Sequence, residues 1–205
     1  MTKDLTEIIQ NLPQQNQKSP ARLAKEFKRS YSNKIIFKDN LFYVRIGNYY
    51  RCITDMSELH SEIVRFLNAS GQDQYISELR IRSIVLTLKG LCALKTELKP
   101  PFKIIENNGD LMAVKDKNYI PLKNGLICVD DYIHENKTTL IPHDPTYFNT
   151  YVLPFDFVEG AIAPTFLSIL DRSLPDKETQ YFLRSWFGYH LVLDTKHEKF
   201  VIFVG

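Results

Sequence analysis

The chain has few cysteines and none of the patterns that a disulfide framework or a metal site would need. Among 205 residues only Cys52, Cys92 and Cys128 are cysteine, and they lie far apart without a CxxC pair. An odd, scattered set argues against a disulfide framework and fits a reducing compartment. The five histidines form no HExxH motif and no Cys/His zinc spacing. The sequence therefore predicts no metal ligand.

Long apolar runs and a large net charge are also missing. No apolar stretch reaches the ~20 residues that cross a bilayer, and the N-terminus lacks the apolar core and cleavage site of a signal peptide. The net charge of +2 is too small to identify a nucleic-acid binder by itself. A hydrophobic content of 44% can fill a core in one domain or two small ones. These features predict a cytoplasmic protein with no membrane partner.

Signatures of common catalytic sites are absent, so no catalytic residue is predicted. There is no GxSxG element, and no cysteine has an evident base partner in the sequence. Asp130 and Asp131 follow an expected strand, but adjacent aspartates point to opposite faces, whereas two-metal chemistry needs carboxylates on one face. Acidic turn residues at a strand end explain the pair better than a metal site does. A metal-dependent enzyme with a site around Asp130, Asp131 and His143 remains a third possible function, beside the two non-enzymatic functions described below.

The order of helix and strand signals predicts an α+β fold. Ser19 and Pro20 start a helix as cap and first helical residue. Strands and a Gly47-Asn48 hairpin follow, then two helices, then short strands broken by turns at residues 108–109 and 124–125. A strand is also expected at 151–153, two helices after Pro164, and a last strand at 199–204. We expect four segments: a weakly ordered start (1–18), a basic helix, hairpin and helical sub-domain (19–100), a third domain (101–197) and a terminal strand (198–205).

The strongest local charge pattern lies on the first of these helices. Its cations are spaced three and four residues apart, so they share a surface that can follow the phosphates of DNA. Aromatic residues that could stack on single-stranded bases lie just beyond. The same pattern also fits a solvated helix face beside an ordinary aromatic core, and the sequence leaves both interpretations open. The DNA-binding candidates are Arg22, Lys25, Lys28 and Arg29; the stacking candidates are Tyr31, Phe42, Tyr43, Tyr49 and Tyr50.

The last third of the chain carries several landmarks in a fixed order. Two strands around an Asn-Gly turn span 120–129, and proline-containing segments follow at 142–145 and 151–157. A PxFxxxL helix begins at Pro164, and a helix over 183–191 contains Trp186-Phe187-Gly188-Tyr189. An apolar strand then leads to Gly205. This order resembles the domain that precedes the helicase in phage and plasmid primase–helicases of superfamily 3.

The resemblance implies a role in DNA replication. In that family the aromatic helix leads into the strand of the Walker A loop, so Gly205 corresponds to the first glycine of an incomplete phosphate-binding loop. ATP and Mg²⁺ are implied for the intact family but not for this chain, which lacks the loop's lysine and Ser/Thr. We therefore expect a truncated protein without its own ATPase activity. Its expected partners are single-stranded or forked DNA and helicase subunits.

Two further expectations follow from the sequence. A structural or regulatory module that binds only protein is the alternative to a DNA-binding role. The terminal strand, 198–205, has no evident sheet to join and would present an adhesive edge. Self-association is therefore expected to be weaker in a chain that ends at Lys196.

Overall fold

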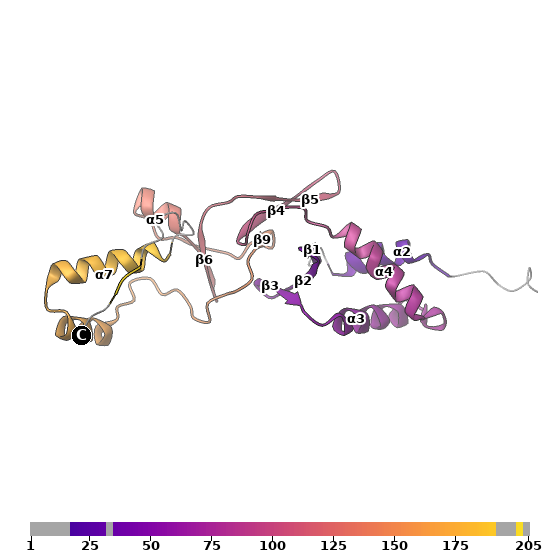
Figure 1. Cartoon of the computed structure of the whole chain (residues 1–205), viewed down its shortest axis with the longest axis horizontal. Helices are drawn as coiled ribbons and strands as arrows, with labels where there is room; N and C mark the ends of the chain where they lie inside the picture. The colour runs from indigo at the N-terminus through magenta and orange to yellow at the C-terminus, as the bar shows by residue number, and fades with distance from the viewer. Residues whose placement is uncertain (1–16, 32–34, 192–199, 203–205) are drawn as a thin grey trace, which may run out of the picture. The chain divides into compact units, whose positions relative to one another are not determined.

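The computed structural model describes residues 17–31, 35–191 and 200–202, and these residues confirm the α+β class (Figure 1). The strands form three small sheets, and every strand pair whose register is known is antiparallel. The chain divides into two compact units. The first takes its described residues from Met1–Ile46, Tyr50–Glu97 and Ile105–Ala113, and the second from Gly47–Tyr49, Leu98–Ile104 and Val114–Gly205. The predicted domain limits stay a prediction.

The first unit is formed mainly by three helices and a three-stranded sheet of order β1-β2-β3. Strand β1 pairs with β2 so that Phe37 lies opposite Phe42. The segment after the last helix adds a parallel bridge to β1, in which Phe37 N donates to Cys92 O at 2.8 Å. The elements are α2 (Pro20–Ser30), β1 (Ile35–Lys38), β2 (Leu41–Ile46), β3 (Tyr49–Ile53), α3 (Met56–Ala69), the short 3-10 helix η1 (Asp73–Tyr75) and α4 (Glu78–Leu91).

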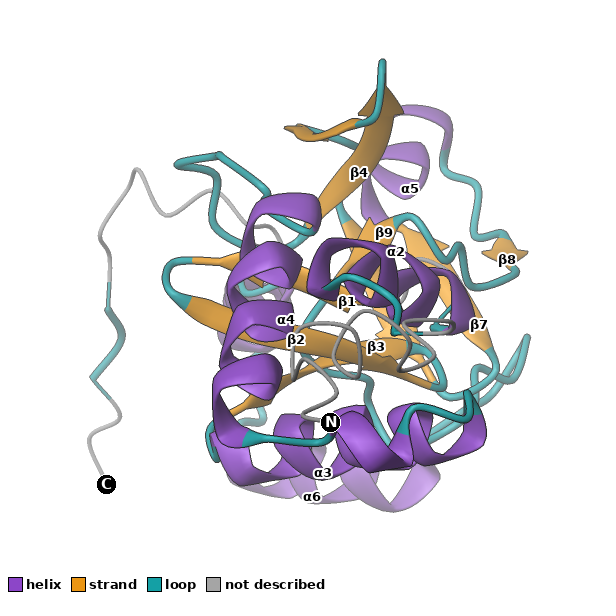
Figure 2. Ribbon diagram, turned by 90° about the vertical axis from the view of Figure 1, so that its right-hand side faces the viewer, coloured by secondary structure: helices purple, strands orange, loops and turns teal. Residues whose placement is uncertain are grey.

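One hydrophobic core joins the helices and strands of this unit. Figure 2 shows the elements that contribute to it, including α2, α3, α4 and the strands β1, β2 and β3. Each helix contributes a stripe at three- and four-residue spacing, which is the pattern of a helix with one buried face. Phe27 packs at the centre, with its ring 4.7 Å from Tyr31 and 5.4 Å from Phe66. The buried members from the helices are Leu23, Ala24, Phe27, Leu59, Ile63, Leu67, Ile84, Val85 and Leu88.

The second unit contains the remaining short strands and the C-terminal helices, except that residues 105–113, the end of the first of these strands and most of the second, belong to the first unit. In β4–β9, Phe102 faces Phe148 and their rings stack 4.9 Å apart. Strand β7 lies between β6 and β8. The elements are β4 (Phe102–Asn107), β5 (Asp110–Val114), β6 (Tyr119–Leu122), β7 (Gly125–Cys128), α5 (Val129–Glu135), β8 (Leu140–Ile141), β9 (Tyr147–Phe148), α6 (Pro164–Ser173) and α7 (Lys177–Tyr189). Strands β4 and β5 flank the expected turn at Asn108-Gly109, where both residues have positive φ.

The turn expected at Asn124-Gly125 is displaced by one residue. Leu122 pairs with Gly125, so the turn consists of residues 123–124 and Gly125 belongs to β7. A Cβ on Gly125 would lie 2.6 Å from the Ile141 carbonyl oxygen and 2.8 Å from a Leu140 methyl carbon. Glycine is therefore needed for the close approach of β8 and not for the turn.

Other local expectations also change. Of the strand expected at 151–153, only an isolated bridge between Leu122 and Leu153 forms. The residues before and after Leu153 are irregular and add no further pairing. Sequence reasoning missed β9, which is only two residues long. Of the expected terminal strand, the described residues 200–202 are not assigned to a strand. Within the described residues, no helix combines the length and apolar character needed to span a membrane.

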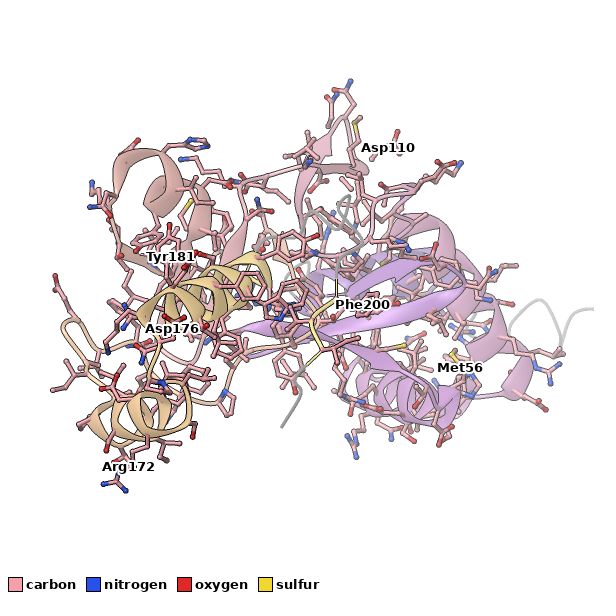
Figure 3. The ribbon with its side chains drawn as sticks, turned by 60° about the vertical axis from the view of Figure 1, so that its left-hand side comes forward. Met56, Asp110, Arg172, Asp176, Tyr181 and Phe200 are labelled. Carbon is pink, nitrogen blue, oxygen red and sulfur yellow. The ribbon has the colours of Figure 1, made fainter. Side chains whose placement is uncertain are left out.

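Helices α6 and α7 follow each other and are linked by polar contacts. Lys177 Nζ lies 2.7 Å from Asp171 Oδ1, and Gln180 Nε2 donates to the Leu174 carbonyl at 2.7 Å. Each helix buries one leucine deeply, Leu170 or Leu183. Most other apolar side chains on the two helices are exposed, including Tyr181 on α7, labelled in Figure 3.

Replacing Gly125 by alanine is expected to destabilise the second unit by about 1–3 kcal/mol, because the new methyl group overlaps the β8 backbone. Gly188→Ala is the matched control in the same unit. Gly188 lies in α7 with open space around it, so alanine should stabilise by ~0.5–1 kcal/mol. Urea unfolding followed by circular dichroism measures both. Equal stability of the two variants would contradict the close approach of β8.

Candidate nucleic-acid interface

Helix α2 begins where the sequence predicts. Ser19 caps it, with its Oγ accepting from Arg22 N at 3.3 Å, and Pro20 occupies the first turn. Leu23, Ala24 and Phe27 are completely buried and fix which face the helix turns inward. The opposite face is left to charged side chains.

Helix α2 lies against α4, and the two helices run in the same general direction (Figure 1). At their N-terminal ends, Arg80 Nη2 donates to the Lys18 carbonyl. At their C-terminal ends, Lys28 Nζ donates to the Leu91 carbonyl at 2.9 Å. Both ends of α2 are therefore tied to α4 by long cationic side chains.

These contacts separate the four DNA-binding candidates into three kinds. Lys28 is half-buried and serves the C-terminus of α4, where an ammonium group satisfies a free carbonyl and complements the helix dipole. Arg22 is exposed but pairs with Glu26 at 3.0 Å. Lys25 and Arg29 are exposed, and neither side chain has an ion-pair partner among the described residues. Only these two are fully available to a ligand.

Glu26 is shared by two cations. Its Oε2 lies 2.9 Å from Lys18 Nζ, and its Oε1 accepts from Arg22 Nε. The hydrogen bond from Lys18, with that from Arg22, holds the pKa of the Glu26 carboxyl below its ordinary value. Glu26 and its two cations lie near the start of α2, where the carboxylate reduces the positive electrostatic field. The charges of Lys25 and Arg29 are not reduced in this way.

The proposed stacking surface is wrong for two of its five members. Phe42 and Tyr50 are 1% and 3% exposed, because β2 and β3 turn these rings into the interior. Tyr31 donates its hydroxyl to Glu62 at 3.1 Å, and burial together with the Glu62 charge raises its pKa to about 12. Tyr43 and Tyr49 remain partly exposed. A run of aromatic residues in sequence does not become a run on the surface, since alternate strand residues face opposite sides.

Asp130 and Asp131, the acidic pair considered above for a metal-dependent enzyme, connect α5 to the segment before β6. Asp130 accepts from both the backbone and the side-chain nitrogen of Asn118, each at 2.9 Å. Asp131 accepts from Lys117 Nζ at 2.6 Å, and this hydrogen bond lowers the pKa of the carboxyl. The two aspartates lie in the first turn of α5, where carboxylates complement the helix dipole.

His143 is also engaged elsewhere, with Nε2 2.7 Å from the Leu122 carbonyl oxygen. Within the described ranges, no three His, Cys, Asp or Glu side chains are grouped as a metal site would require. Gly205 and the strand leading to it lie outside the described residues, apart from 200–202. The incomplete phosphate-binding loop therefore stays a prediction.

Sequence reasoning missed Arg80 and Gln72, two polar residues buried between α2 and α4. Arg80 is 8% exposed and Gln72 2% exposed, and Arg80 Nη2 lies 3.2 Å from Gln72 Oε1. A signal existed, because Arg80 stands four residues before Ile84 on the apolar stripe of α4. A cation in such a stripe indicates a buried polar contact.

Comparisons with known proteins do not assign the chain to a family. No protein-family model matches the chain, and no curated protein matches it. The resemblance over 120–205 therefore stays a prediction that depends on the landmarks themselves.

Lys28→Ala is expected to destabilise the first unit by about 1 kcal/mol, since the Leu91 carbonyl loses a charged donor. Lys25→Ala, one turn earlier on the exposed face, should change stability by less than ~0.5 kcal/mol. Urea unfolding of the two variants provides the comparison. If both lose the same stability, Lys28 has no structural role beyond that of a surface lysine.

Proposed function

We propose that this protein binds DNA in a replication system, as the helicase-preceding region of a superfamily 3 primase–helicase. In this proposal α2 contacts the sugar–phosphate backbone of single-stranded or forked DNA through Lys25 and Arg29, with Arg22 beside them. Helicase subunits of the same family are its protein partners. ATP and Mg²⁺ belong to the motor domain of that family and have no part in the DNA contact proposed for α2.

The single observation that supports the DNA contact is the exposed charge on α2. Lys25 and Arg29 are four residues apart on one face, without carboxylate partners among the residues described. The buried face of the helix holds it in place, so little ordering entropy is lost when a phosphate chain binds. Lys28 is left out, because its ammonium group is already used at Leu91.

A second candidate function, a module that binds only protein, is favoured by α6 and α7. Ile169, Tyr181 and Phe182 are 57%, 72% and 55% exposed, which is unusual for several large apolar side chains on two linked helices. Exposed apolar patches of this kind mark interaction sites in soluble proteins. This candidate needs no contribution from the cations of α2.

The double substitution Lys25→Gln and Arg29→Gln is expected to weaken single-stranded DNA binding. It should also reduce the slope of log K against log salt by about 1.4, since each phosphate contact on a single strand contributes ~0.7. Fluorescence anisotropy with a labelled oligonucleotide at several salt concentrations measures both quantities.

Arg65→Gln with Arg82→Gln is the matched control. It removes the same two charges from the first unit, but each arginine is already paired with a glutamate on its own helix. The control should keep most of the affinity and of the slope. If the α2 variant behaves like this control, α2 is not the DNA contact; if the unsubstituted protein binds no DNA at low salt, the DNA-binding proposal fails.

The substitution Phe182→Lys tests whether α7 provides the protein contact. Charge on the exposed face of α7 should prevent co-purification with a full-length helicase of the family if that face contacts it, and should leave DNA binding unchanged. Co-purification by the unsubstituted protein, combined with no DNA binding, would favour the protein-only module.

A further inference from the structure

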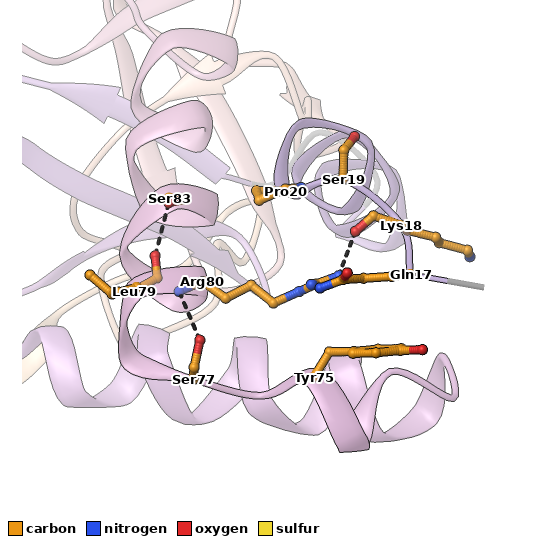
Figure 4. Close-up of a pocket in the computed structure, with 9 residues that line it drawn as sticks. All are labelled: Gln17, Lys18, Ser19, Pro20, Tyr75, Ser77, Leu79, Arg80 and Ser83. Atoms are coloured by element: carbon orange, nitrogen blue, oxygen red, sulfur yellow. Dashed lines mark hydrogen bonds between the residues drawn. The ribbon is translucent and has the colours of Figure 1, made fainter. Parts of the chain in front are cut away.

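A cavity of about 470 Å³ opens where the N-terminal ends of α2 and α4 meet, within the first unit (Figure 4). Ser19 and Pro20 border it from α2, and Ser77, Arg80 and Ser83 border it from α4. A second hollow of about 620 Å³ shares Lys18 with the first and adds Arg22 and the backbone around Gly71. Lys18 borders both hollows, Arg80 borders the first and Arg22 the second, and neither lining includes a carboxylate among the described residues.

Electrostatics at this place favour a negative charge. Each helix N-terminus carries about half a positive elementary charge from its unpaired N–H groups, and here two such ends lie side by side. Helix α2 has no acid in its first turn, and α4 has only Glu78, which pairs with Arg82 at 2.5 Å and does not line the cavity. Arg80 adds its charge to these positive helix ends, whereas Glu26 pairs with the other two cations of the linings, Lys18 and Arg22.

Arg80 provides an independent indication that a partner is missing. Its side chain crosses from α4 towards Lys18, above the ring of Tyr75, whose centroid is 5.5 Å from the guanidinium carbon (Figure 4). Nη2 is used by the Lys18 carbonyl and by Gln72. Among the described residues, no group accepts a hydrogen bond from the buried Nε. An unpaired buried donor costs ~1–3 kcal/mol or more when it is charged, and native proteins supply nearly every such group with a partner.

The hydroxyl groups beside Arg80 are suited to the same ligand. Ser19 and Ser77 accept hydrogen bonds from the backbone N–H groups of Arg22 and Arg80 as helix caps. Each hydroxyl keeps its own proton, which can be donated to an oxyanion across the cavity mouth. Helix N-terminal N–H groups, hydroxyls and a guanidinium are the donors that proteins use for phosphate.

We propose that the cavity between the N-terminal ends of α2 and α4 binds a phosphate group, held by Arg80, Ser19 and Ser77. The phosphate balances the two helix ends and the Arg80 charge, and a small shift of the guanidinium brings Nε into contact with it. The site does not depend on the DNA contact at Lys25 and Arg29. Its ligand is inorganic phosphate or a terminal phosphate ester.

A pair of substitutions at Ser77 tests the site without removing the helix cap. Asparagine and aspartate both cap helices well, so Ser77→Asn and Ser77→Asp should both fold. Only aspartate places a fixed negative charge at the cavity. We expect Ser77→Asp to bind phosphate at least tenfold more weakly than Ser77→Asn, and to have the higher melting temperature in chloride, because its carboxylate replaces the anion.

Thermal unfolding of the whole chain in 50 mM phosphate and in sodium chloride of equal ionic strength provides the measurement. For a dissociation constant of about 10 mM, phosphate should raise the melting temperature of the unsubstituted protein and of Ser77→Asn by about 2–4 °C, and that of Ser77→Asp, which binds at least tenfold more weakly, by less than ~1 °C. The same rise in both variants, or no rise in the unsubstituted protein, overturns the proposal and leaves an ordered water as the partner of Arg80.

The resonance of the Arg80 Nε–H group, assigned by its loss in Arg80→Lys, gives a direct readout. Titration with inorganic phosphate should shift this resonance in saturable fashion, and chloride should not. A dinucleotide with a 5′-phosphate, compared with its 5′-hydroxyl counterpart, separates the two sources. A shift with inorganic phosphate alone identifies the free anion, a shift with the phosphorylated dinucleotide identifies a nucleic-acid end, and no shift with either rejects the site.

Discussion

The packing of α2 along α4 is the constraint on which the first unit depends. Leu23 and Phe27 of α2 share one core with Ile84 and Leu88 of α4, so neither helix can rotate without exposing large apolar side chains. This packing decides which cations of α2 meet solvent and which meet protein. It also brings together two segments that are distant in sequence, the chain around Lys18 and the start of α4.

The charged groups at the two ends of this helix pair relate differently to the helix dipoles. At the C-terminal ends, Lys28 supplies a positive charge to free carbonyl groups, as the helix dipole favours. At the N-terminal ends a cation, Arg80, stands where an anion would be favourable. Helices α3 and α7 are capped by Asp55 and Asp176, whereas α2 and α4 are capped by the uncharged Ser19 and Ser77. The phosphate proposed above would lie beside Arg80 at these two N-terminal ends.

The second unit presents a different surface. Its small sheet is held by close backbone approach at Gly125 and by the Asn118–Asp130 contacts, and it leaves α6 and α7 with much apolar surface. The acidic pair that resembled a possible metal site is used in structure, since each carboxylate has its own partner from the segment before β6. The exposed apolar side chains of α6 and α7 and the exposed cations of α2 therefore belong to separate units.

Local signals in the sequence determined the α+β class and most element starts, because caps such as Ser19 and Ser77 act within three residues of their partners. They also placed Lys25 and Arg29 on one face. Sequence alone could not separate Lys28 from Lys25, since only the position of the distant Leu91 carbonyl distinguishes them. Nor could it bring Arg80 to Lys18 or show that Gly125 is needed beside Ile141. Tertiary structure decided these points, because each depends on two segments that meet only when the core forms.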